Sequence, residues 1–297
     1  MCAKKLTFLI YVLAAFFLPG SAGVYAKQPG GKQQTGILWQ IERSGLRPSY
    51  IFGTVHTDDS RVIRLPEIIR LKFRQADSFV AELMLDKFSM QQASELMFLP
   101  RGQKLEELIG TQRYQRCVEL LVQYDIPRHV IERMKPWAVM VMLSMPKSRS
   151  GVVLDQRLYQ EAELQGKKRY GLETNSEQVA VFESFTLQQQ IIMLDDAIKD
   201  NRRLPAVFDE LLHYYLQRDL TGLERISEKY MLQGDNMLAK SFKQKALLDR
   251  NYRMVRRMKP RLNEGNSFIA VGALHLPGDE GILRLLEKEG YRVTAVY

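Results

Sequence analysis

The 297-residue chain has very little cysteine, only Cys2 and Cys117. Cys2 lies in the N-terminal segment, so Cys117 has no partner for a disulfide in the rest of the chain, and we expect a buried, unreactive thiol there. Long apolar runs are also missing beyond the N-terminal segment, which disfavours a membrane span. Gly-x-Ser-x-Gly, phosphate-binding glycine loops, Cys-x-x-Cys and His-Glu-x-x-His are absent as well. Several common classes of hydrolase, nucleotide-binding and redox protein are therefore disfavoured.

The N-terminal segment has the pattern of a secretory signal peptide. Two lysines precede an uncharged apolar run over residues 6–18, and small residues lead to Ala26. This order of charge, apolar core and small residues predicts cleavage after Ala26. An uncleaved membrane anchor is the alternative. Export without disulfides favours a periplasmic or secreted protein.

The remainder of the chain shows no linker-like boundary. Residues 1–26 are the predicted signal peptide, and residues 27–36, rich in glycine, glutamine and lysine, are predicted to be a disordered leader. Residues 37–297 are predicted to form a single domain. A separate helical domain is the alternative, because residues 89–144 and 188–228 have helical spacing of their apolar residues.

A short phrase occurs twice, and it contains two of the four histidines. Residues 50–56 read YIFGTVH and residues 268–275 read FIAVGALH, so each apolar run leads into Gly-x-x-His. Each run predicts a buried strand that ends in a tight turn. His56 and His275 would then lie at the carboxyl ends of strands, where α/β proteins bind their ligands.

The flanks of the two phrases also match. Each is followed by a loop, an amphipathic stretch and a second apolar run, which is the order of a βαβ unit. The sequence therefore predicts an α/β (α+β mixed) fold, in which two βαβ-like halves form a central mixed sheet. A large helical insertion separates the halves, and a further short strand is expected within it, before Glu173.

Two carboxylates share the predicted environment of the histidines. Glu82 and Glu173 both follow predicted strands, and in a parallel arrangement such strand ends meet at one edge of the sheet. Two imidazoles and a carboxylate could bind a metal ion that activates water, with a second carboxylate as general base. The alternatives are hydrogen-bonded core histidines and a salt bridge between Glu82 and an arginine.

The chain is basic, with a formal net charge of +9 that falls to +7 when Lys4 and Lys5 are removed with the signal peptide. One segment concentrates this charge: Arg250, Arg253, Arg256, Arg257, Lys259 and Arg261. We expect a solvated helix that Pro260 ends, with each arginine a surface charge. The alternatives are that Arg250 or Asn251 binds a substrate carboxylate or orients a ligand, and that the helix binds an acidic polysaccharide or another envelope surface. Export argues against a nucleic acid partner.

The residues around the two phrases resemble the TraB/GumN family, with the GumN branch the most similar. The resemblance rests on residues 52–56, the strand end at Glu82, residues 171–173 and residues 271–278. The family is related to the Tiki metalloproteases and is described by two Gly-x-x-His motifs and an acidic residue. By resemblance, His56, His275 and Glu82 would bind a divalent metal ion.

The resemblance also bears on the remaining candidates and on the reaction. Glu173 and the Arg250–Asn251 pair match recurrent positions of the family, and Glu82, Glu173 and Arg250 are the catalytic candidates. We expect an exported metal-dependent hydrolase that contains manganese, cobalt or zinc and acts on a peptide or protein substrate. The alternative is a non-catalytic periplasmic accessory or binding protein linked to surface polysaccharide.

Overall fold

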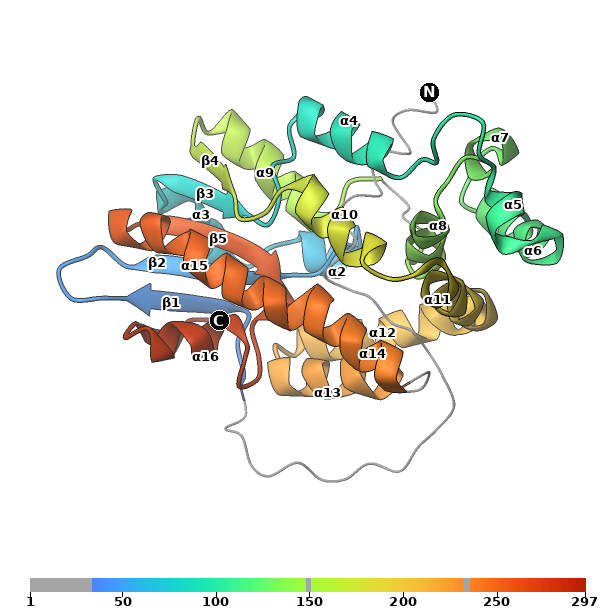
Figure 1. The fold of residues 1–297 in the computed structure, drawn as a ribbon. Coiled ribbons are helices and arrows are strands. Elements are labelled where there is room, and N and C mark those ends of the chain that lie inside the picture. Colours follow the sequence, from blue (N-terminus) through green and yellow to red (C-terminus); the bar gives the residue numbers. More distant parts are fainter. Residues whose placement is uncertain (1–33, 148–150, 232–235) are drawn as a thin grey trace.

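A six-stranded mixed sheet forms one side of the computed structural model, flanked by helices, and most of the helical insertion extends to the other side (Figure 1). The structure describes residues 34–147, 151–231 and 236–297. The strands are β1 (Leu38–Glu42), β2 (Ser49–Thr54), β3 (Ser78–Ala81), β4 (Lys168–Gly171), β5 (Ser267–Gly272) and β6 (Arg292–Ala295). Their order across the sheet is β4-β3-β5-β2-β1-β6.

The strands of the two Gly-x-x-His phrases are direct neighbours. β2 and β5 pair in parallel, with Tyr50 opposite Phe268 and Thr54 opposite Gly272. β3 is parallel to β5, and β4 is parallel to β3, whereas β1 is antiparallel to both β2 and β6. Every residue of β2 and β5 is buried, which is why both appear in the sequence as unbroken apolar runs.

Both predicted βαβ units are present, and they interlock. The first runs from β2 through α2 (Ser60–Ile63) and α3 (Glu67–Gln75) to β3. The second runs from β5 through η4 (Ala273–His275) and α16 (Ile282–Lys288) to β6. β5 lies between β2 and β3, while β2 and β1 lie between β5 and β6. Each unit therefore encloses a strand of the other, and neither half can complete the sheet alone.

The helical insertion follows β3 and returns to the sheet at β5, and it contributes β4 on the way. Its helices before β4 are α4 (Lys87–Leu96), α5 (Leu105–Ile109), α6 (Thr111–Val122), α7 (Arg128–Ile131), α8 (Pro136–Leu143) and α9 (Leu154–Leu164). After β4 come α10 (Asn175–Glu183), α11 (Leu187–Asp200), η2 (Asn201–Arg203), α12 (Leu204–Leu216), α13 (Leu220–Met231), α14 (Asn236–Lys243), the π-helical η3 (Gln244–Leu248) and α15 (Asp249–Glu264).

The buried apolar side chains form two clusters. The first surrounds the sheet and includes Phe52 and Phe268. The second lies within the insertion and includes Leu121, Trp137 and Phe242. Cys117 is fully buried in this second cluster, as expected, and burial raises the pKa of its thiol to about 12. The insertion thus has a core of its own, and the single domain over residues 37–297 stays a prediction.

Two features of the fold differ from the predictions. Pro260 does not end the basic helix, because α15 continues to Glu264 and stops at Gly265, which has a φ of 73°. The packing of Met258 and Leu262, both buried in the first cluster, holds the helix together across the exposed proline. Residues 34–36, predicted as disordered, are hydrogen-bonded to the start of α13, where Leu220 N–H donates to Gln34 O at 3.0 Å.

The N-terminal predictions fall largely outside the described residues. The predicted signal peptide, residues 1–26, and residues 27–33 of the predicted leader are not among them. Among the residues that are described, no helix combines the length and the apolar character needed to cross a membrane.

Candidate functional site

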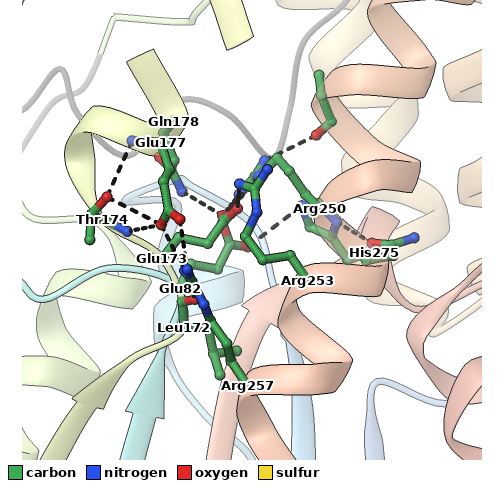
Figure 2. A network of polar contacts seen from close by, with 12 residues as sticks. Glu82, Leu172, Glu173, Thr174, Glu177, Gln178, Arg250, Arg253, Arg257 and His275 are labelled. Carbon is green, nitrogen blue, oxygen red and sulfur yellow. Dashed lines mark hydrogen bonds and ion pairs between the residues drawn. The ribbon is translucent and has the colours of Figure 1, made fainter. Parts of the chain in front are cut away.

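The predicted site residues come together at one edge of the sheet. His56 lies two residues after β2, Glu82 directly after β3, Glu173 two residues after β4 and His275 three residues after β5. These four strands are parallel, so their carboxyl ends share that edge. Helix α15 lies across this part of the sheet (Figure 1). It adds Arg250, labelled in Figure 2, and Asn251.

Gly53 of β2 allows the turn that carries His275 to pack closely over this strand. A Cβ atom at this position would lie 2.8 Å from Leu276 Cδ1 and 3.1 Å from Ala273 Cα. Both neighbours belong to the turn that carries His275. The first glycine of the repeated phrase therefore has a packing role, since it lets the η4 turn approach β2.

Glu82 is held by donors on both of its carboxylate oxygens. Oε1 accepts the N–H of Gly272 at 2.6 Å, and Oε2 accepts Nη2 of Arg250 at 2.6 Å. Burial, the largest single effect, would raise the pKa of this carboxyl, but the guanidinium of Arg250, the two histidines and the Gly272 N–H together outweigh it, and the pKa falls to about 2. Glu82 is therefore an anion at neutral pH. The salt bridge to an arginine, one of the alternatives from the sequence, is present.

Arg250 is completely buried, so the prediction of a surface charge is wrong for it. Its Nε donates to Glu173 Oε2 at 2.8 Å, and its Nη1 donates to the Ala246 carbonyl at 3.1 Å. The reason is the position of α15, whose inner side meets the acidic strand ends (Figure 2). The guanidinium bridges Glu82 and Glu173, and the desolvated carboxylates compensate its charge.

Glu173 has no exposed side-chain surface and is saturated with donors. Besides Arg250 it accepts Arg253 Nη1 at 2.8 Å on Oε1 and Gln178 Nε2 at 3.2 Å on Oε2 (Figure 2).

Five of the six cations of the basic segment form ion pairs with acidic side chains. The pairs are Arg250 with Glu82 and Glu173, Arg253 with Glu173, Arg257 with Glu177, Lys259 with Glu289, and Arg261 with Glu264.

His56 is fixed by a carboxylate that no sequence motif indicates. Its Nδ1 lies 2.7 Å from Asp155 Oδ2, and the Thr54 hydroxyl donates to Asp155 Oδ1 at 2.6 Å. Burial disfavours the protonated imidazole, but Asp155 overcomes this effect and the pKa of His56 is raised. Asp155 stands in the first turn of α9, which docks there because the Leu154 N–H donates to the Thr57 carbonyl.

His275 is fixed by an amide. Its Nδ1 lies 2.6 Å from Asn251 Oδ1, while its Nε2 lies 3.8 Å from Glu82 Oε1. That Nε2 is buried, and no described residue forms a hydrogen bond with it. Burial, followed by the charge of Arg250, lowers the pKa of His275 to about 3, so the ring is neutral.

Asp155 has the weakest sequence signal of the site residues, and Asn251 is indicated only by its place beside Arg250. Asp155 is 99 residues from His56 and belongs to an ordinary helix start. Asn251 follows Arg250 in a segment dominated by arginines. The π-helical turn η3 ends at Leu248, two residues before Arg250. Such turns occur often at functional sites, but the sequence gives no clear sign of one here.

The side chains at this edge are of types that bind divalent metal ions, although the described residues contain no ready-made ligand set. Across residues 34–147, 151–231 and 236–297, no three His, Cys, Asp or Glu side chains form a group that could hold a metal ion. The fit rests on the imidazoles of His56 and His275, the carboxylate of Glu82 and the unpartnered Nε2 of His275. Imidazole and carboxylate are donors that zinc and related ions accept.

A separate groove of about 660 Å³ lies in the helical insertion. Its lining residues include Phe98, Leu99, His129 and Arg133, and none of the predicted site residues is among them. The groove and the sheet edge are therefore different features of the surface.

The fold and the sheet edge define an α/β protein with a buried cluster of histidines, carboxylates and arginine. The sequence model of the TraB/PrgY/gumN family matches residues 37–295, and the chain belongs to this family. The resemblance drawn from the two phrases is confirmed.

Curated relatives include animal proteins and a bacterial one. Metalloprotease TIKI2 of Danio rerio is 26% identical over 356 residues, which cover 98% of this chain and 68% of the relative. Metalloprotease TIKI1 of Homo sapiens is 26% identical over 335 residues, which cover 93% and 64%. The uncharacterized protein YbaP of Shigella flexneri is 22% identical over 268 residues, which cover 86% and 94%. The family thus includes proteins named metalloproteases.

Proposed function

We propose that this protein is an exported, metal-dependent hydrolase that cleaves peptide bonds. The observation that carries the proposal is the buried Nε2 of His275, which lies 3.8 Å from a carboxylate oxygen of Glu82 and has no hydrogen-bond partner in the described part of the chain. A buried nitrogen without a partner costs free energy unless a ligand compensates it. The relatives named metalloproteases support the reaction class.

His56, His275 and Glu82 would hold the ion, which could be manganese, cobalt or zinc. When bound, such an ion lowers the pKa of a water molecule toward neutrality and makes it a nucleophile. Glu82 is suited to be a ligand because it stays ionised well below neutral pH. The same low pKa makes it a weak proton acceptor, so of its two predicted roles, ligand and base, we propose ligand.

Glu173 and Arg250 are better suited to position other groups than to touch a substrate. Both side chains have no exposed surface. The oxygens of Glu173 already accept three donor side chains, which leaves it poorly placed to take a proton from water. Arg250 fixes Oε2 of Glu82. This orients Oε1, which also accepts the Gly272 N–H, toward Nε2 of His275.

Metal content tests the proposal. Chelator-treated mature protein would be loaded separately with manganese, cobalt and zinc and assayed for bound metal. We expect about one equivalent of at least one ion in the wild type, a large loss in His56→Ala and His275→Ala, and no loss in the control His213→Ala. His213 is exposed on α12, outside the site. A wild type that retains none of the three ions would contradict the proposal.

The reaction needs its own test. Metal-loaded wild type and Glu82→Gln would each be incubated with a broad peptide library. We expect new peptide termini that depend on the metal and on Glu82. If metal-loaded protein produces none, the peptidase assignment fails even though the metal site stands.

Export is part of the proposal and is supported by the sequence pattern of residues 1–26. The mass of the protein recovered from the periplasm or the medium should correspond to a chain that begins at Lys27. Recovery of the full-length chain in the membrane fraction would favour the uncleaved anchor. The accessory function through the basic helix stays a prediction. It has little support from the charges of the helix, because most of its cations are paired with acids of the same chain.

A further inference from the structure

The two candidate metal-binding histidines are held by chemically different partners. Both hydrogen bonds use Nδ1, but His56 faces a carboxylate, Asp155, and His275 faces an amide, Asn251. Which ring nitrogen carries the proton depends on what these partners accept or donate. The contacts around each partner decide this question for both rings.

For His275 the decisive contact is made by the other end of the amide. Asn251 Nδ2 lies 2.8 Å from the backbone carbonyl of Glu280. A carbonyl can only accept, so the NH₂ group must point to it and the amide oxygen must point to His275. The amide oxygen in turn can only accept, so Nδ1 of His275 carries the hydrogen. In the neutral ring, Nε2 then has the lone pair.

For His56 the carboxylate gives the same result directly. An ionised carboxylate only accepts, and its other oxygen already accepts the Thr54 hydroxyl. Nδ1 of His56 therefore carries a hydrogen, and the neutral ring has its lone pair on Nε2. Burial explains the choice of partner: Asp155 has a partly exposed side chain, whereas Asn251 is only 1% exposed and an uncompensated charge there would be costly.

We propose that Asp155 and Asn251 are positioning residues that fix the Nδ1–H tautomer and the ring orientation of His56 and His275, so that both Nε2 atoms can bind metal. The inference rests on the proposed function, and it assigns duties to two residues that do not themselves touch the ion. Outer partners of this kind typically change metal affinity by about 10- to 100-fold.

The tautomers can be measured without metal. With only four histidines in the chain, a ¹⁵N-histidine spectrum of the metal-free wild type can be assigned by substitution. At a pH where His56 is neutral, we expect the Nδ1–H form for both His56 and His275, and a mixture of the two tautomers for the exposed His129. An Nε2–H form of His275 in the wild type would overturn the inference, whatever the variants show.

Metal affinity provides the second measurement. Asp155→Ala and Asn251→Leu should each weaken binding of the ion that the wild type takes up by about 10- to 100-fold. Asp155→Asn should retain most of the affinity, because an amide oxygen can accept the same N–H, as Asn251 does at His275. The control Asp195→Ala removes a half-exposed carboxylate of α11 and should bind as the wild type does.

The outcomes separate the two proposals. Wild-type affinity in folded Asp155→Ala and Asn251→Leu would overturn the inference and leave the metal site intact. A wild type that binds none of the three ions would overturn both. Circular dichroism of each variant shows whether it is folded. If Asp155→Ala is not, a loss of about 10-fold or more in folded Asp155→Asn relative to the wild type would still contradict rescue by the amide.

Discussion

At the residue scale, the buried guanidinium of Arg250 is the centre of the site. It joins the carboxyl end of β3, through Glu82, to that of β4, through Glu173, and its own carbonyl contact to Ala246 fixes it to the preceding turn. Two adjacent carboxylates at a sheet edge would repel each other without this charge. Arg250 thus makes the dense acidic edge compatible with a folded chain.

Replacing Arg250 should therefore be costly. Arg250→Met keeps much of the volume but leaves Glu82 and Glu173 buried without their shared cation. We expect a loss of about 3–5 kcal/mol in the free energy of unfolding, measured in urea at pH 7. Arg256→Met, on the exposed side of the same helix, should change it by less than about 0.5 kcal/mol. Equal effects of the two substitutions would contradict the role given to Arg250.

At the element scale, the strands were predictable because their environment is simple. β2 and β5 are buried on both faces, so burial alone produces apolar runs, and the glycines mark where the runs end. The common edge of the site then follows from parallel pairing. His56, His275, Glu82 and Glu173 could be placed there from sequence for this reason.

The remaining parts of the site depend on packing between distant elements. Asp155 reaches His56 only because α9 docks on the loop after β2, and nothing local in the sequence encodes that contact. The burial of Arg250 was missed because its neighbours in sequence are arginines, which usually face solvent. Pro260 was misjudged because local propensity is weaker than the packing of the flanking turns.

Glu177 links two of these elements and should make stability depend on pH. It accepts Nη1 and Nη2 of Arg257 at 2.7 and 2.6 Å, which ties α10 to α15, and it also caps α10 through the Thr174 N–H (Figure 2). The ion pair with Arg257 lowers the pKa of Glu177 from 4.5 to about 2. A lowered pKa in the folded state means that the stabilisation is complete above about pH 4.5 and is lost as the pH falls through 2.

The substitution Glu177→Gln tests this dependence. Glutamine can still cap the helix but carries no charge, so the variant should lose less stability than the wild type between pH 5 and pH 2.5. Because the side chain is 30% exposed and screened by solvent, we expect a difference of about 1 kcal/mol in urea unfolding. The control is Glu119→Gln, in an exposed pair on α6, which should follow the wild type. Identical pH profiles for Glu177→Gln and the wild type would contradict the assignment.

At the scale of the whole molecule, one continuous helical run connects the two apolar clusters. α14, η3 and α15 follow one another without a break from Asn236 to Glu264. Phe242 and Ala246 of this run belong to the cluster of the insertion, whereas Met254 and Met258 belong to the cluster of the sheet. Unfolding of either cluster would disturb the other through this run, and the site residues Arg250 and Asn251 lie between the two.

We therefore expect the sheet and the insertion to unfold together, and the two tryptophans report on them separately. Trp39 packs against the cluster of the sheet, and Trp137 lies in the cluster of the insertion, stacked on Phe182. In Trp39→Phe and Trp137→Phe, the fluorescence of the remaining tryptophan should follow urea unfolding with the same midpoint as circular dichroism of that variant. Using each variant as its own reference removes any effect of the substitution on stability. The contrary result is a fluorescence midpoint that differs from the dichroism midpoint by more than about 0.5 M of urea, in opposite directions in the two variants. It would show two separately folding units, with the site at their junction.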